Sequence, residues 1–258
     1  MDRTAVLAEF DNQIRRNPAA EPGSRVEREQ QVIRVISSGD GWSGVLWADL
    51  TEADADAMIA AQVSRFAERG RPWEWKYYSY DQPAGLPGRL RAAGFVPEPA
   101  ETLLVAQVAD LDLDVSAPAG VELVPVTDAR GVSAVVDVHN EVFGGDHAAI
   151  GSYLRAALAA EPRPVEAVVA VAGAVPISAG RVDFPADSDF AGLWGGGTLP
   201  AWRGRGVFRS LVAYRARLAR DRGYRYLQVD ASADSSPILQ RLGFAELAPT
   251  TPFIYPGY

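Results

Sequence analysis

The sequence contains no cysteine among its 258 residues and only two histidines, His139 and His147. The absence of thiols excludes disulfides, thiolate zinc sites and a cysteine nucleophile. Two histidines argue against a histidine-rich metal centre and against a serine–histidine–aspartate triad. We therefore predict a protein without a metal centre.

Long apolar runs and an excess of positive charge are also missing. No segment approaches the roughly 20 apolar residues that cross a bilayer, and the N-terminal stretch MDRTAVLAEFDNQIRR lacks the order of a signal peptide. The formal net charge of −8 argues against nucleic acid as the main partner, because binding a phosphate backbone needs a basic face. We expect a cytoplasmic monomer or homodimer with neither a membrane nor a nucleic acid as partner.

Strand and helix patterns alternate along the chain and predict an α/β (α+β) fold with a mixed central sheet flanked by helices. Residues 44–105 and 192–254 share one order: strand, helix ending in Arg-Gly, aromatic strand ending in aspartate, short helix, strand. The acidic, proline-containing stretch 109–120 indicates a linker between them. This order suggests a duplication into two tandem units, residues 1–114 and 115–258, although two βαβαβ units can share it by chance.

Glycine and arginine concentrate in the stretch GGGTLPAWRGRGVFRSL, residues 195–211, which leads into a predicted helix. Between Trp202 and Tyr226 there are eight arginines and one acid, Asp221. A helix N-terminus presents free N–H groups and a positive dipole, and glycines let a bulky anion approach the backbone. The stretch matches neither a P-loop nor the dinucleotide-binding fingerprint. The alternatives are a solvated arginine-rich helix face and a kinked edge strand without a ligand.

This stretch resembles the acetyl-CoA loop of the GNAT superfamily of N-acetyltransferases, Q/R-x-x-G-x-G/A after a strand that ends near proline. Arg203 to Phe208 occupy the loop and Pro200 the proline position. A second family pattern, a polar residue, a short helix and a final Gly-Phe, corresponds to Ser232–Phe244. The resemblance extends more loosely over residues 120–255.

The resemblance implies that the C-terminal unit binds acetyl-CoA as co-substrate. Backbone groups of Gly196, Gly197 and Thr198 would pair with the pantetheine arm, and Ser232 would donate a hydrogen bond where the family often has asparagine. The pyrophosphate would be held at the loop, by the residues Arg203, Gly204, Arg205, Gly206, Val207, Phe208 and Arg209.

Three further family positions carry a different residue here. Phe208 replaces a small residue of the loop, Leu239 replaces the tyrosine that often acts as general acid, and Gly192 stands where some members place a glutamate base. An amine with a pKa near 10 must lose a proton before it attacks a thioester. Our candidates for this proton transfer are Asp230, which otherwise serves as a cap, and Glu141, which otherwise lies on a solvated helix face.

These observations predict direct acetyl transfer to the primary amine of a small molecule or peptide, in a ternary complex. The alternatives are a CoA sensor or scaffold without activity, and acylation of a hydroxyl or with a longer acyl-CoA. We expect one acetyl-CoA per chain, because the corresponding N-terminal segment DLTEADADAM has acids in place of glycine and arginine. The aromatic strand at residues 73–78 is then available to wall the acceptor site.

Overall fold

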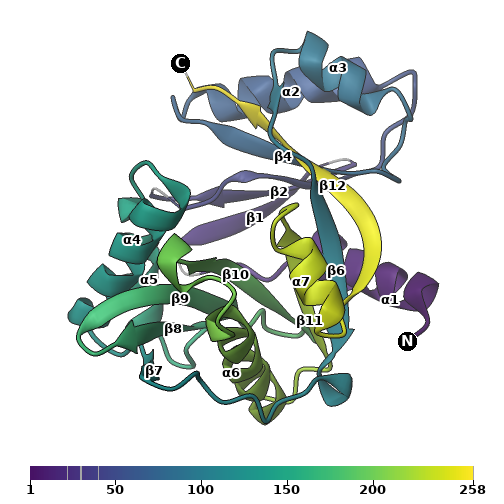
Figure 1. Ribbon diagram of the computed structural model, residues 1–258. Coiled ribbons are helices and arrows are strands. Elements are labelled where there is room, and N and C mark those ends of the chain that lie inside the picture. The colour runs from purple at the N-terminus through teal and green to yellow at the C-terminus, as the bar shows by residue number, and fades with distance from the viewer. Residues whose placement is uncertain (22, 30, 40, 258) are drawn as a thin grey trace. The chain divides into compact units, whose positions relative to one another are not determined.

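The computed structural model describes residues 1–257 except residues 22, 30 and 40, and it divides the chain into two compact units (Figure 1). Unit 1 comprises Met1, Val105–Val229 and Leu239–Ala245. Unit 2 comprises the described residues of Asp2–Leu104, Asp230–Ile238 and Glu246–Tyr258. In the described part of the chain, no helix is both long and apolar enough to cross a membrane.

Unit 2 places its strands in the order β1–β2–β3–β4–β12–β6, and the β3–β4 pair is parallel, whereas β1–β2, β2–β3 and β4–β12 are antiparallel. Its strands are β1 (Ser24–Glu29), β2 (Val32–Ser37), β3 (Gly44–Ala48), β4 (Trp73–Tyr78), the short β5 (Val96–Pro97), β12 (Ala245–Tyr255) and the start of β6 (Glu101–Gln107). Its helices are α1 (Arg3–Phe10), continued by a π-helical segment (Asp11–Arg16), α2 (Ala55–Ala67) and α3 (Leu86–Ala92).

Unit 1 places its strands in the order β6–β11–β10–β9–β8–β7, and β10–β11 is the parallel pair. Its strands are β7 (Val121–Pro125), β8 (Val165–Ala172), β9 (Val175–Asp183), β10 (Phe190–Thr198) and most of β11 (Tyr226–Ala231). Its helices are α4 (Ala129–Phe143), α5 (Ala148–Leu158) and α6 (Val207–Asp221), with 3-10 turns at Val108–Asp110 and Pro200–Trp202. Helix α7 (Ser236–Arg241) is shared between the units.

Alternation along β8 gives unit 1 a core on each face of its sheet, because successive side chains of a strand point to opposite faces. Val165, Ala167 and Val169 pack with α4 and α5, whereas Val168 and Ala170 pack with α6. Helices α4 and α6 therefore cover opposite faces of the sheet, and both contact β9 and β10. The glycine-rich strand β10 is thus contacted by a helix from each side.

The last strand of each half of the sequence, β6 or β12, lies beside a strand of the other half. The C-terminal strand β12 pairs antiparallel with β4, from Thr250 opposite Tyr78 to Tyr255 opposite Trp73. In the strand order, β6 lies beside β11. The compact units are therefore discontinuous in sequence, while the duplication and its assignment to residues 1–114 and 115–258 stay predictions.

The aromatic strand β4 builds the core of unit 2. Trp73, Trp75 and Tyr78 are buried, and the ring of Trp73 stacks on Phe66 at 4.1 Å between centroids. Burial of large aromatic surface is the strongest single contribution to such a core. These three side chains therefore pack in the interior of unit 2, whereas the sequence suggested that they wall an acceptor site.

Candidate functional site

The predicted phosphate-binding loop is the N-terminus of α6. Gly206 is its N-cap residue in the left-handed conformation, with φ of 86°, and no side chain caps the helix. The first turn contains no acid. An added Cβ on Gly204 would meet nothing within 4 Å, and one on Gly206 would meet only Pro118, at 3.8 Å. An uncapped N-terminus with open space around its glycines is suited to an anion.

Each loop arginine has a partner inside unit 1. Arg203 donates through Nε to the Thr198 carbonyl at 3.0 Å, and the guanidinium of Arg205 lies 5.0 Å from the centroid of the Trp202 ring. Arg209 forms an ion pair of 2.8 Å with Asp112, and both side chains are more than half exposed. Such exposed contacts contribute little free energy, so they orient the arginines without removing them from an incoming anion.

Strand β10 contains a bulge at its glycines. Trp194 pairs with Arg181 and Gly197 with Ala179, so Gly195 and Gly196 lie opposite the single residue Gly180. Gly195 has φ of 59°, which favours glycine. A bulge leaves backbone groups without ladder partners and re-aims the strand beyond it.

Two buried side chains hold this bulge from the two faces of the sheet. On the α4 side, His139 Nε2 lies 2.9 Å from the Gly195 carbonyl oxygen. On the α6 side, Arg215 Nη1 donates to the Arg181 carbonyl at 3.1 Å. Burial lowers the pKa of His139 to about 4 and that of Arg215 to about 10. At neutral pH the imidazole is therefore uncharged and donates its Nε2 proton, whereas the guanidinium keeps its charge.

Neither residue was predicted to hold the bulge. Arg215 follows Leu211 and Val212 by four and three residues, so its position on the buried face of α6 could have been read from the helical period. His139 likewise lies between the buried Val135 and Val138 and the half-buried Val142 of α4. The carbonyls that they bind belong to other elements, and no local signal identifies them.

The remaining predicted cofactor residues lie around the bulge and beyond it. The Phe208 ring points at β10, where its Cε2 atom is 3.1 Å from an added Cβ on Gly196. Gly197 lies under Val142 and Phe143 of α4, each 2.9 Å from an added Cβ. Thr198 is buried with its hydroxyl 2.7 Å from Ser178 Oγ. These residues and the loop at 203–209 all belong to unit 1, whereas Ser232 belongs to unit 2.

The two predicted proton acceptors belong to different units. Asp230 is part of unit 2, where its carboxylate is 3% exposed and forms an ion pair of 3.0 Å with Lys76. Burial opposes the charge of Lys76, but Asp230 and Glu74 outweigh it and raise its pKa well above the usual value. Glu141 is an exposed residue of α4 in unit 1. Among the described residues, no three His, Cys, Asp or Glu side chains are grouped to hold a metal ion.

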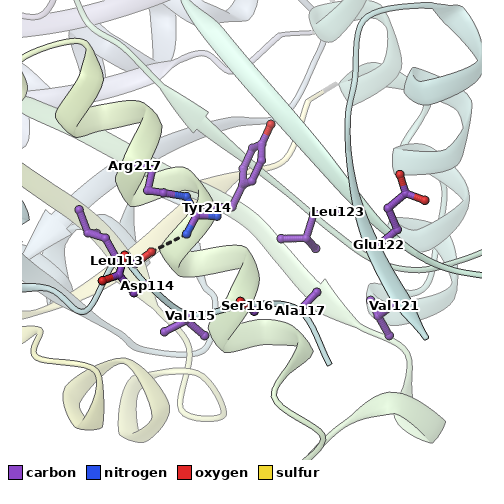
Figure 2. A pocket seen from close by; sticks show the side chains of 10 residues that line it. All are labelled: Leu113, Asp114, Val115, Ser116, Ala117, Val121, Glu122, Leu123, Tyr214 and Arg217. Atoms are coloured by element: carbon purple, nitrogen blue, oxygen red, sulfur yellow. Dashed lines mark hydrogen bonds between the residues drawn. The ribbon is translucent and has the colours of Figure 1, made fainter. Parts of the chain in front are cut away.

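A pocket of about 580 Å³ lies beside α6, and none of the predicted site residues lines it (Figure 2). Figure 2 shows Tyr214 and Arg217 of α6 facing it, with Arg217 donating to the Leu113 carbonyl of the predicted linker. Linker residues 113–117 and strand β7 form its other walls. The linker therefore packs along α6 and is an ordered part of unit 1.

Known structures share this architecture over almost the whole chain. A GCN5-related N-acetyltransferase from Kribbella flavida superposes with a TM-score of 0.70 at 20% identity, covering 99% of this chain and 95% of that one. One from Sphaerobacter thermophilus gives 0.62 at 11% identity, with coverage of 99% and 86%. A tandem GNAT protein from the clavulanic acid biosynthesis pathway gives 0.61 at 16% identity, with coverage of 93% and 85%.

No family model and no curated protein matches the sequence of the chain, whereas solved structures match its fold. The predicted mixed sheet flanked by helices, in two tandem units, is confirmed by these structural neighbours. The chain has the fold of the GCN5-related N-acetyltransferases.

Proposed function

We propose that unit 1 binds acetyl-CoA and transfers its acetyl group to a primary amine by direct attack in a ternary complex. The observation that carries this proposal is the continuous path from the bulged glycines of β10 to the uncapped N-terminus of α6. The register of β10 with β11 ends at Gly192, so the edge of β10 beyond it can pair with an extended amide chain, and the helix N-terminus takes a pyrophosphate. Pantetheine followed by pyrophosphate has this order of groups.

The acceptor in this proposal is a cationic small molecule or a peptide N-terminus. The protein carries a net charge of −8, which attracts a cation to its surface. We further propose that the protein acts in the cytoplasm as a monomer or homodimer, without metal, membrane or nucleic acid. A CoA sensor without activity is the second candidate, because the family's glutamate and tyrosine positions hold Gly192 and Leu239.

The binding step is tested by a pair of glycine variants with equal backbone strain. Gly206 and Gly223 lie at opposite ends of α6 with φ of 86° and 81°, so Gly206→Ala and Gly223→Ala incur a similar cost of about 1–2 kcal/mol. Calorimetric titration with CoA should show weaker binding for Gly206→Ala alone, because its methyl group obstructs the phosphate approach. Equal affinities of the two variants would contradict a phosphate site at this terminus.

The transfer step is tested by thiol release from acetyl-CoA in the presence of spermidine, an aminoglycoside or a short peptide. Thiol release that depends on one of these amines supports the enzyme. CoA binding without thiol release from any of them supports the sensor.

A further inference from the structure

Some family members carry a glutamate base at the position that Gly192 occupies here. Gly192 has no side chain, but polar groups lie beside it. Gly192 of β10 pairs with Asp183 of β9 on one side and with Gln228 of β11 on the other. An added Cβ on Gly192 would lie 2.5 Å from Trp194 Nε1 and 2.8 Å from Gln228 Nε2. Residues directly opposite one another in adjacent strands share a face of the sheet. Asp183 therefore presents the nearest cross-strand carboxylate on the face where the glutamate is missing.

The Asp183 carboxylate is fixed in one orientation. Arg181 Nε contacts its two oxygens at 3.1 and 3.5 Å, and the Tyr153 hydroxyl of α5 donates a further hydrogen bond. The Asp183 side chain is 12% exposed, so the carboxylate is largely buried but keeps a small exposed area. A carboxylate that its neighbours hold in one orientation and that is not fully buried can act as a general base.

The other carboxylates considered for this task are placed less favourably. Asp230 and Asp183 each form an ion pair, with Lys76 at 3.0 Å and with Arg181 at 3.1 Å, but the Asp230 side chain is only 3% exposed against 12% for Asp183. Glu141 is an exposed residue of α4 and does not belong to the strands beside Gly192. Asp183 combines burial with residual access.

We propose, on the basis of the proposed function, that Asp183 is the catalytic proton acceptor of the acetyl transfer. The carboxylate takes one proton from the acceptor ammonium, directly or through one water. The free amine attacks the thioester carbon, and collapse of the tetrahedral intermediate breaks the C–S bond. The departing CoA thiolate takes the second proton from the nitrogen, and Asp183 returns its proton to water.

The pKa of Asp183 depends on its burial and on polar groups from the elements packed around it. Burial raises its pKa, whereas Arg181 of its own strand, the Tyr153 hydroxyl of α5 and the Arg215 guanidinium of α6 lower it. His139 of α4 is uncharged above pH 4 and adds no charge there. A raised pKa improves proton acceptance near neutral pH and places the loss of activity on the acid side.

The test compares Asp183→Asn with Asp187→Asn, the same change at an exposed residue of the following turn. In the thiol-release assay with the best amine of the panel, Asp183→Asn should lower kcat by roughly 10²–10⁴-fold. It should also remove the acid limb of the kcat/KM profile and leave the affinity for CoA unchanged. Asp187→Asn should match the wild type in all three measurements.

Three results would overturn the proposal or separate it from the proposed function. A folded Asp183→Asn variant with wild-type kcat and an unchanged acid limb overturns Asp183 as the acceptor while leaving the enzyme in place. If that variant does not fold, Tyr153→Phe decides: loss of a hydrogen bond to the carboxylate should move the acid limb to higher pH, and an unmoved limb overturns the proposal. A wild type that binds CoA but acetylates no amine overturns both.

Discussion

Replacement of His139 by glutamine should change how the stability of the protein depends on pH. In the folded chain its pKa is about 4, whereas an unfolded histidine titrates near 6.5. Below pH 6.5 the unfolded chain therefore binds a proton that the folded chain does not, and the free energy of unfolding falls as the pH falls towards 4. From these two values, protonation of His139 in the unfolded chain costs roughly 1 kcal/mol of stability at pH 5.5, and the cost approaches roughly 3 kcal/mol below pH 4.

Glutamine keeps an N–H donor for the Gly195 carbonyl and does not titrate. Urea unfolding followed by tryptophan fluorescence at pH 7.5 and pH 5.5 measures the effect. Between pH 7.5 and pH 5.5 the free energy of unfolding of the wild type should fall by roughly 1 kcal/mol more than that of His139→Gln. His147→Gln, which removes the other histidine from its contact with the Gly144 carbonyl, should retain most of the wild-type dependence. Parallel pH dependences of the wild type and His139→Gln would refute a buried neutral imidazole at the bulge.

Three further outcomes follow from the placement of charged residues. Arg215→Met leaves a carbonyl at the bulge without its donor and should lower stability by about 1–3 kcal/mol in thermal unfolding and weaken CoA binding, unlike Arg220→Met at an exposed position of the same helix. Lys76→Met leaves Asp230 buried without its counter-charge and should cost about 3–5 kcal/mol in urea unfolding. Native mass spectrometry should show one CoA per chain, because acids occupy the start of α2, and two equivalent sites would contradict this charge argument.

The sequence by itself determined the local features of the candidate site. Gly206 takes a left-handed conformation that begins α6, Gly195 and Gly196 of β10 form a bulge, and the acids at the start of α2 differ from the basic start of α6. Each follows from conformational freedom or charge within a few residues. The order of strands and helices along both halves was readable for the same reason, because local period sets the type of element.

Only the tertiary structure decided which distant groups meet. The placement of β12 beside β4, the binding of the Gly195 carbonyl by His139, and the position of Asp183 opposite Gly192 all join residues far apart in the chain or on separate strands. Strand register and buried hydrogen bonds are fixed by packing against partners that the local sequence does not specify. The sequence therefore determined where the glycine-rich loop ends and α6 begins, and the fold determined that Asp183 lies opposite Gly192.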